Sequence, residues 1–254
     1  MPEQKDIISF DSAKNKCQYC HAASFCISKD LADNDLAAFN TLIKRPKPLQ
    51  KGERLFQAGD KFDLIYIVHS GSVKAYIESS DGEQQITGFN FSGDLLGIAG
   101  LEENHYNYSV EALETSSFCE IPFTLFENAA HENPELQQQF LCAMSREMTR
   151  EQKLILLLGK MDSKRRIASF LVAMSARMQA QGYSADNIIL SMTRHDIANY
   201  LGMAIETVSR LLTQFQSEDI LHVAGRHITI INQHRLHAIS DNFIESDYHT
   251  GETA

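Results

Sequence analysis

Three cysteines near the start of the chain have the residue type and spacing of a metal-binding loop. Two residues separate Cys17 from Cys20, and five separate Cys20 from Cys26. Thiolates bind zinc and iron–sulfur clusters, and three on one short loop can point at one centre. The distant Cys119 can supply a fourth ligand, whereas Cys142 fits no cluster and is expected in the core. The residues alone leave open whether zinc or an iron–sulfur cluster is bound.

The composition is typical of an ordinary soluble protein with two domains. The chain has 254 residues, of which 43% are apolar and 22% are charged. The longest apolar candidate, Leu154 to Leu158, is far short of a membrane span, and the start MPEQKDIISF lacks a signal-peptide pattern. We therefore expect a cytoplasmic protein without membrane association, in which clustered cysteines are metal or redox ligands rather than disulfides.

The net charge of −10 is unevenly distributed along the chain. Residues 1–143 carry 11 Lys and Arg against 21 Asp and Glu, whereas residues 144–237 carry 12 against 8. Basic surfaces attract nucleic acids, so the C-terminal part is the side expected to bind DNA.

The segment from Lys51 to about Phe123 has the pattern of short antiparallel strands. Apolar runs such as LIYIVHS and SVKAYI alternate with turn residues, among them Gly52 and Gly93. Asp81-Gly82 stands between two alternating runs, which predicts a two-residue hairpin turn. The regular spacing of these runs predicts a β-roll or barrel.

A long helix is predicted from Asn133-Pro134 to about Gly159. Asn133 is a favourable cap, and Pro134 suits the first helical position. Residues spaced by three and four form the a/d seam of a two-stranded coiled coil, which predicts a dimerisation helix. The seam consists of Leu141, Met144, Met148, Glu151, Ile155 and Leu158.

Glu151 is the unfavourable member of this seam. In a two-fold dimer it faces its own copy, and two desolvated carboxylates repel each other. We therefore expect a conditional dimer. In the alternative arrangement, Glu151 lies at the rim, where Arg146 or Arg150 of the second copy neutralises it.

The segment TRHDIANYLGMAIETVSRLLTQF has the pattern of a helix-turn-helix. The small Ala198 lets two helices cross closely, Gly202 supplies the left-handed turn conformation, and Val208 packs the helices together. A helix from Asp162 to about Ala180 precedes this motif. The run ILHVAGRHITII after it predicts a two-stranded wing.

The second helix of the motif has a polar face that can read base edges in the major groove. Glu206, Ser209 and Arg210 occupy positions i, i+3 and i+4. Arginine binds guanine O6 and N7 with two hydrogen bonds, and glutamate accepts one from cytosine N4. The alternative is a solvated face with an internal Glu206–Arg210 ion pair. The predicted DNA-binding set is completed by Thr193, Arg194 and Thr207.

A β-roll, a long dimer helix and a winged helix-turn-helix, in this order, resemble the cyclic AMP receptor protein superfamily. With its N-terminal cysteines, the chain is identified as a member of the FNR (fumarate and nitrate reduction regulator) family. The resemblance is carried by CQYCHAASFC, PLQKGERLFQAGD, QITGF, ALETSSFCEIPF and the run from MTRHDIANYLG through ETVSRLL. It implies an α+β fold with an N-terminal antiparallel β-roll sensory domain, a long dimerisation helix and a C-terminal winged helix-turn-helix domain.

This resemblance implies an oxygen-responsive transcription regulator and not an enzyme. A [4Fe-4S] cluster on the four cysteines would assemble without oxygen, favour the homodimer and permit binding to double-stranded DNA. Family members read TTGAT-like inverted repeats with residues matching Glu206, Ser209 and Arg210. They then recruit or block RNA polymerase at genes of anaerobic metabolism.

The expected domains follow the order of these motifs along the chain. They are a cysteine-rich cluster-binding segment (1–30), the sensory domain (31–133), the dimerisation helix (134–159), the DNA-binding domain (160–240) and a mobile tail (241–254).

Several residues depart from the family pattern. Ala204 replaces the usual hydroxyl residue that caps the recognition helix, at a cost of about 1 kcal/mol. Tyr19, His21 and Phe25 are bulky or titratable residues beside the cysteines, where they can tune cluster lability. His21 also leaves open a different ligand set.

Two alternatives remain within the same superfamily. A zinc-stabilised regulator is chemically adequate, because cysteine and histidine are zinc ligands. A cyclic-nucleotide-responsive regulator requires a cation for the phosphate, and GDLLGIAGLEENHYNYSVEA has Tyr108-Ser109 and no arginine where that branch has Arg-Ser or Arg-Thr. No nucleophile elbow, phosphate loop or paired carboxylates favour an enzyme.

Overall fold

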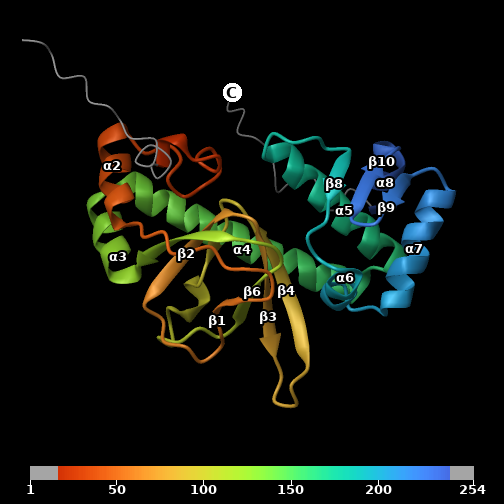
Figure 1. Ribbon diagram of the computed structural model, residues 1–254, viewed down its shortest axis with the longest axis horizontal. Helices are drawn as coiled ribbons and strands as arrows, with labels where there is room; N and C mark the ends of the chain where they lie inside the picture. The colour runs from red at the N-terminus through yellow and green to blue at the C-terminus, as the bar shows by residue number, and fades with distance from the viewer. Residues whose placement is uncertain (1–16, 241–254) are drawn as a thin grey trace, which may run out of the picture. The chain divides into compact units, whose positions relative to one another are not determined.

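A computed structural model describes residues 17–240 of the chain (Figure 1). By their internal contacts these residues form two compact units. Unit 1 comprises residues 17–73 and 90–144, and unit 2 comprises residues 74–89 and 145–240. The predicted tail (241–254) and the first sixteen residues of the predicted cluster-binding segment lie outside the described residues.

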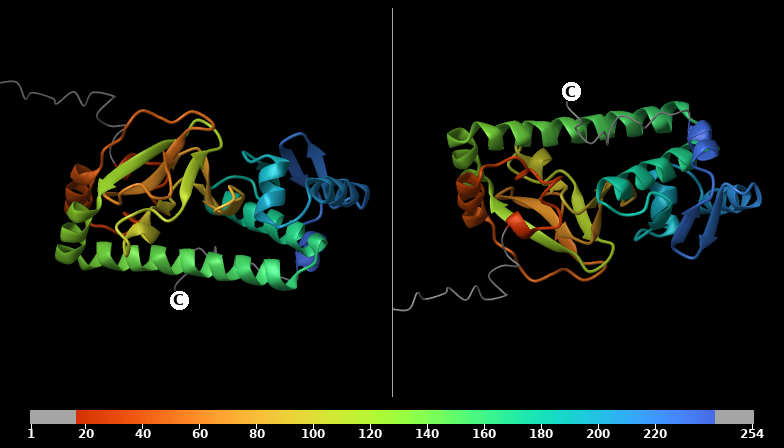
Figure 2. Two further views of the ribbon diagram at one scale, coloured as in Figure 1. Left: turned by 90° about the horizontal axis from the view of Figure 1, so that it is seen from below. Right: turned by 90° about the horizontal axis from the view of Figure 1, so that it is seen from above.

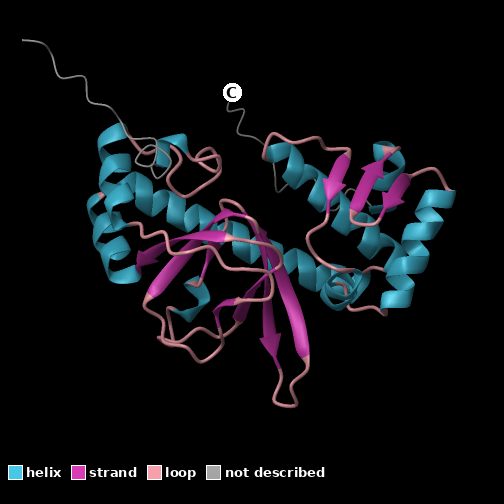
Figure 3. Ribbon diagram, in the orientation of Figure 1, coloured by secondary structure: helices cyan, strands magenta, loops and turns pink. Residues whose placement is uncertain are grey.

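Residues 54–122 form an antiparallel β-roll, as the strand pattern predicts (Figure 3), and residues 74–89 of this roll are counted with unit 2. One sheet has the order β5-β2-β7, and the other has the order β1-β6-β3-β4. The strands are β1 (Arg54–Phe56), β2 (Leu64–Ser70), β3 (Ser72–Glu78), β4 (Gln84–Phe91), β5 (Leu95–Leu96), β6 (Ser109–Ala112) and β7 (Ser117–Pro122). The helical elements are η1 (Cys17–Tyr19), α2 (Asp33–Leu42), η2 (Ile98–Gly100) and α3 (Phe123–Glu132).

The hairpin between β3 and β4 is present, but its turn is longer than predicted. The Ser79 N–H donates to the Glu83 carbonyl at 2.9 Å, which leaves three residues in the loop rather than two. Within it the Gly82 N–H donates to the Ser79 carbonyl at 2.9 Å, and Gly82 has a φ of +84°. The prediction of a two-residue turn was wrong. In the predicted turn, Asp81 and Gly82 would be the two central residues, whereas here the left-handed Gly82 comes directly after a complete turn.

Aromatic side chains fill the interior of the β-roll. The buried rings of Phe56 and Tyr106 stack with their centroids 4.0 Å apart, and Tyr66 lies 5.6 Å from Phe56. The Tyr106 hydroxyl donates to the Leu64 carbonyl at 2.7 Å, so its polar end is satisfied. This packing fixes β2, whose central residues are buried.

Helix α4 (Pro134–Lys160) is the predicted long helix and runs without interruption in both views of Figure 2. The Asn133 side chain accepts a hydrogen bond from the Leu136 N–H at 2.7 Å, which confirms the predicted cap. The helix ends at Lys160, one residue beyond the expectation. Within the described residues, no helix is both long enough and apolar enough to cross a membrane.

Unit 2 contains the predicted winged helix-turn-helix. Its elements are α5 (Ser163–Ala180), β8 (Asn187–Ile189), α6 (Arg194–Tyr200), α7 (Ile205–Ser217), β9 (Leu221–Ala224), β10 (His227–Ile230) and α8 (Gln233–Ser240). The predicted wing is the β9–β10 hairpin, and β8 adds a third strand in the order β8-β10-β9. Asp162 caps α5 by accepting a hydrogen bond from the Arg165 N–H.

Candidate functional site

The four predicted ligand cysteines line a single pocket in unit 1, hereafter the cysteine pocket. Cys17 lies in η1, Cys20 and Cys26 lie in the loop that follows, and Cys119 lies in β7. The remaining wall is formed by Ala22, Ala23, Ser28, Phe39, Ile43, Arg45, Ile67, Val68 and His69. The structure therefore brings together cysteines that are about ninety or more positions apart in the sequence.

Local hydrogen bonds shape the loop that carries three of these cysteines. The Cys20 N–H donates to the Cys17 carbonyl at 3.0 Å, and the Cys26 N–H donates to the Ala22 carbonyl at 2.9 Å. The Cys17 N–H donates to Asn40 Oδ1 at 3.3 Å, which attaches the loop to α2. Successive tight turns thus fold the loop back on itself beside the sheet.

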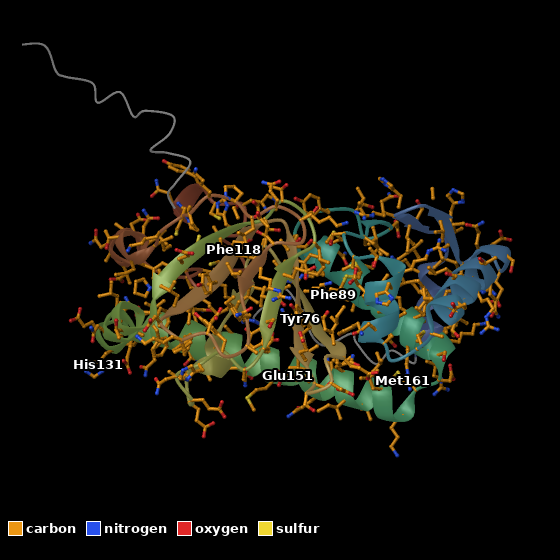
Figure 4. The ribbon with its side chains drawn as sticks, turned by 60° about the horizontal axis from the view of Figure 1, so that its bottom comes forward. Tyr76, Phe89, Phe118, His131, Glu151 and Met161 are labelled. Atoms are coloured by element: carbon orange, nitrogen blue, oxygen red, sulfur yellow. The ribbon has the colours of Figure 1, made fainter. Side chains whose placement is uncertain are left out.

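The fourth cysteine is positioned by strand pairing. In the antiparallel pair β2–β7, Cys119 lies opposite Ile67, and its neighbour Phe118 lies opposite Val68. Phe118 is buried, and Figure 4 labels it within β7. Successive residues of a strand face opposite sides of the sheet. In this register Cys119 therefore faces the cysteine loop, and Phe118 faces the opposite side.

Burial makes the thiolate forms of these cysteines costly. Burial, with a contribution from the neighbouring Cys26 and Cys119, raises the pKa of Cys17 to about 12. Burial also raises the pKa of Cys119 to about 11 and raises the pKa of Cys26. Bringing such thiolates together requires a compensating cation, which a metal centre supplies. Within residues 17–240, no group of three or more His, Cys, Asp and Glu side chains is arranged as a ready-made metal site.

Two side chains at the pocket were not predicted to be functional. Arg45 lines the pocket, and its charge lowers the pKa of both Cys119 and Cys17 against the larger effect of burial. His69 lines the pocket from β2, with Nδ1 3.1 Å from Ser117 Oγ. Burial, followed by the charge of Arg45, lowers the pKa of His69. Neither residue belongs to a motif, so the sequence offers no signal for them.

The bulky residues beside the cysteines point elsewhere. Tyr19 is 65% exposed, and His21 is exposed with its ring edge against Phe25, the two centroids 6.2 Å apart. The alternative ligand set with His21 stays a prediction that requires this side chain to turn.

The helix-turn-helix is held by local contacts within unit 2. Thr193 Oγ1 accepts a hydrogen bond from the Asp196 N–H at 3.1 Å, and Asp196 Oδ2 accepts one from the Thr193 N–H at 2.9 Å. This capping box begins α6. Gly202 has a φ of +59°, as its predicted turn position requires, and Ala198 and Val208 are buried between the helices.

The predicted base-reading residues lie together on the outer face of α7. Glu206 and Arg210 are exposed, and Ser209 is half-buried. Arg194 Nη1 lies 3.3 Å from Ser209 Oγ, and Arg210 Nη2 lies 3.2 Å from Thr207 Oγ1. One surface therefore holds charged donors and an acceptor of the kind that base edges require. Within this set, the Thr193 hydroxyl is engaged in the capping box.

Much of the predicted seam of α4 is apolar and exposed, although Met144 and Leu158 are half-buried. Leu141, Met148 and Ile155 are 52%, 59% and 72% exposed, although such side chains are normally covered. Glu151, also exposed, lies among them on the helix (Figure 4). Arg150 Nη1 pairs with Glu147 Oε2 of the same helix at 3.1 Å. The seam itself stays a prediction.

Comparison with known proteins agrees with this architecture. Residues 46–133 match the model of the cyclic nucleotide-binding domain, and residues 165–239 match the model of the Crp-like helix-turn-helix domain. The chain is 42% identical over 229 residues to the transcriptional activator protein Anr of Pseudomonas protegens, with 90% of this chain and 94% of that protein covered. The chain belongs to the FNR family of the cyclic AMP receptor protein superfamily.

Other relatives give the same assignment. The fumarate and nitrate reduction regulatory protein of Vibrio cholerae is 41% identical, with 87% of this chain and 88% of the relative covered. The anaerobic regulatory protein of Haemophilus influenzae is 43% identical, with 84% and 83% covered. Among solved structures, FixK2 from Bradyrhizobium japonicum is similar with a TM-score of 0.70 and 30% identity, covering 78% of this chain and 96% of that one. This FNR-family member is therefore a transcription regulator that binds DNA, and not an enzyme.

The β-roll of this FNR-family protein differs from a cyclic-nucleotide site where a phosphate would need donors. The Gly97 N–H already donates to the Tyr108 hydroxyl at 2.7 Å. The segment that contains both residues has no arginine. A bound cyclic phosphodiester would have to displace this hydrogen bond without gaining a cation.

The recognition helix of this FNR-family protein lacks the usual side-chain cap. Ala204 occupies the cap position with φ of −69° and ψ of 144°, and no side-chain hydrogen bond is made there. This conformation is the one that a capping serine or threonine adopts, so the predicted position of Ala204 at the cap is confirmed.

Proposed function

We propose that this protein is a cytoplasmic, oxygen-responsive transcription regulator. A [4Fe-4S] cluster held by Cys17, Cys20, Cys26 and Cys119 promotes homodimerisation and binding to TTGAT-like inverted repeats at genes of anaerobic metabolism. The observation that carries this proposal is the shared, buried pocket of four cysteines drawn from a loop and a remote strand. The names of the relatives, which refer to anaerobic regulation and to fumarate and nitrate reduction, support the choice of oxygen as the signal.

The donor set fits an iron–sulfur cluster. Four thiolates are the usual ligands of [4Fe-4S] clusters, and the raised pKa values of Cys17 and Cys119 keep these thiols protonated at neutral pH until a metal centre binds. When bound, the cluster supplies an oxygen-labile centre that links the loop to β7. Cys17 and Cys119 lose their protons on assembly, so cluster binding couples loop structure to the metal centre.

Dimerisation is the proposed step that the cluster controls. The seam exposes apolar side chains that a second α4 would cover, while Glu151 opposes the same contact. A modest stabilisation from cluster binding suffices to shift such a balanced equilibrium. Loss of the cluster would then return the protein to monomers.

DNA binding follows from dimerisation because two half-sites are engaged at once. A recognition helix on a monomer binds one half-site weakly, whereas a rigid dimer gains the effective concentration of its second helix. Glu206, Ser209 and Arg210 are proposed to read the bases, and the bound dimer then recruits or blocks RNA polymerase. The wing residues Arg226 and His227, both exposed, would contact phosphates and set the register.

The test is anaerobic purification followed by exposure to air. Iron, sulfide and zinc content and the visible absorbance are measured, together with binding to a duplex carrying a TTGAT inverted repeat and to a scrambled duplex at one salt concentration. We expect a coloured, dimeric, DNA-binding protein without oxygen and a colourless, weakly binding one after exposure. Equal DNA binding in both states would refute oxygen control. A colourless zinc protein that is stable in air would favour the zinc-stabilised alternative.

A further inference from the structure

Arg45 occupies an unusual place in the cysteine pocket. Among the residues that line the pocket, it is the one with a permanent positive charge, because a guanidinium does not deprotonate in proteins. Its side chain is half-buried and lines the same pocket as Cys119. It lines the pocket together with the loop cysteines and with Cys119 of β7, so it lies beside both segments that contribute the proposed ligands.

The backbone holds Arg45 in this place. Its neighbour Lys44 forms an isolated antiparallel bridge with Glu120, in which the two N–H groups donate to the opposite carbonyls at 2.9 and 2.8 Å. Glu120 directly follows Cys119 in β7. Adjacent residues of an extended segment face opposite sides, and accordingly Lys44 is exposed whereas Arg45 lines the pocket.

The negative charge of the proposed centre would be stabilised by a cation at the position of Arg45. Four thiolates around a core of charge +2, whether a divalent ion or an oxidised [4Fe-4S] core, leave a net charge of −2. A buried dianion is strongly disfavoured unless a cation lies near it. A guanidinium is weakly hydrated compared with an ammonium and is suited to a partly buried ion pair.

We propose that Arg45 is a charge-compensating residue of the cysteine pocket that determines how tightly the four-thiolate centre is held. This inference rests on the proposed function only in that the four cysteines bind a metal centre. Arg45 does not coordinate the metal centre itself. Its charge controls the affinity of the pocket for the centre and the rate at which the centre is lost.

The first test uses Co²⁺ as a probe of the full-length apo protein under anaerobic conditions. Arg45→Gln removes the charge but keeps a hydrogen-bond donor, Arg45→Lys keeps the charge, and Lys44→Gln removes an adjacent exposed charge as the matched control. We expect Arg45→Gln to weaken Co²⁺ binding, read from thiolate charge-transfer absorbance, by about tenfold or more. We expect Arg45→Lys and Lys44→Gln to stay within about threefold of the unmodified protein.

The second test follows the reconstituted cluster in air. Arg45→Gln should lose its visible absorbance about tenfold faster than the unmodified protein, whereas Lys44→Gln should not. Far-UV circular dichroism and thermal melting of the apo variants check the fold. If Arg45→Gln is unstable, Arg45→Met is used instead, with the same expected loss of affinity and faster decay. Normal affinity and decay in Arg45→Lys would show that the charge matters rather than packing alone.

The outcomes separate this inference from the proposed function. Co²⁺ binding without any iron–sulfur cluster defeats the proposed function but still measures the role of Arg45. Unchanged affinity and decay in a well-folded Arg45→Gln protein overturn the inference and leave the proposed function intact. Equal losses in Arg45→Gln and Arg45→Lys, or in Arg45→Gln and Lys44→Gln, also overturn it, because they assign the effect to something other than this charge.

Discussion

The helix-turn-helix and the cysteine pocket are built in opposite ways. The residues that define the helix-turn-helix lie in one short segment, from Thr193 to Phe215, and hydrogen bonds between near neighbours hold it. The pocket joins a loop near Cys17 to a strand at Cys119, and it gathers thiols whose pKa values are raised. The surface proposed to read DNA is therefore formed by one short segment, whereas ionisation of the buried thiols in the pocket is favourable only with a compensating cation. A regulator is most easily controlled at the site that depends on an added component.

The largest expected effect comes from removing the remote ligand. Cys119→Ala should abolish cluster retention, because three thiolates from the loop cannot complete a four-thiolate site. Iron and sulfide analysis after anaerobic purification measures this, and thermal melting of the DNA-binding domain should not change. Cys142→Ala is the matched control, since Cys142 lies in α4 outside the pocket. A Cys119→Ala protein with full iron content would contradict the proposed ligand set.

A change on the DNA-reading surface should leave the pocket untouched. Arg210→Ala should weaken binding to the TTGAT repeat by roughly 10- to 100-fold, because it removes the two hydrogen bonds that we propose Arg210 makes to a guanine. Fluorescence anisotropy with specific and scrambled duplexes measures the specificity ratio. Arg226→Ala, which changes an exposed residue of the wing, should weaken binding to both duplexes alike. Loss of cluster in Arg210→Ala would break the proposed independence of the two regions.

The seam is the proposed link between the two regions. Glu151→Ala should strengthen dimerisation of the apo protein on the order of tenfold, because a repulsion across the two-fold axis is removed. Sedimentation of the apo protein over a range of concentrations measures it. Glu147→Ala serves as the control, since Glu147 pairs with Arg150 within the same helix. If Glu151→Ala and the unmodified protein dimerise equally, Glu151 is not the element that opposes assembly.

Restoring a cap should strengthen the recognition helix. Ala204→Ser places a hydroxyl where the backbone already has the capping conformation, and it should stabilise the DNA-binding domain by about 1 kcal/mol. Thermal unfolding should show a midpoint a few degrees higher. Ala204→Gly, which cannot accept a hydrogen bond through its side chain, separates capping from backbone effects. No gain in Ala204→Ser would mean that the N-terminal N–H groups of α7 are already satisfied by water.

The smallest expected effect is a pH dependence of the first helix of the motif. Burial acts to raise the pKa of Asp196, but hydrogen bonds from Thr193 and the charge of Lys74 outweigh it, and the pKa is lowered overall. A lowered pKa contributes stability above the unfolded value of about 4, and this contribution is lost as the pH falls through the folded value. Asp196→Asn should therefore reduce the melting temperature at neutral pH but make little difference in acid. A constant difference at every pH would assign the effect to packing.

The accuracy of prediction from sequence differed between the two regions for a physical reason. Helix α4 with its Asn133 cap, the start of α5 near Asp162 and the turn at Gly202 were predicted because caps, periodicity and left-handed glycines act over a few residues. Helices α2, α3 and α8 and strand β8 were not predicted. Helix α2 has no side-chain cap, and β8 exists only because it pairs with β10. The hairpin turn at Gly82 was mispredicted by one residue because the same dipeptide suits two turn types.

The sequence by itself determined the residue types on which the proposed function rests: the loop cysteines, the polar face of α7 and the apolar seam with its single carboxylate. Only the tertiary structure decided that Cys119 lies beside the loop and that Arg45 lies beside Cys119. Those placements depend on the register of β7 with β2 and on the Lys44–Glu120 bridge. Such pairings join residues distant along the chain, and the collective packing of the β-roll selects them rather than any local preference.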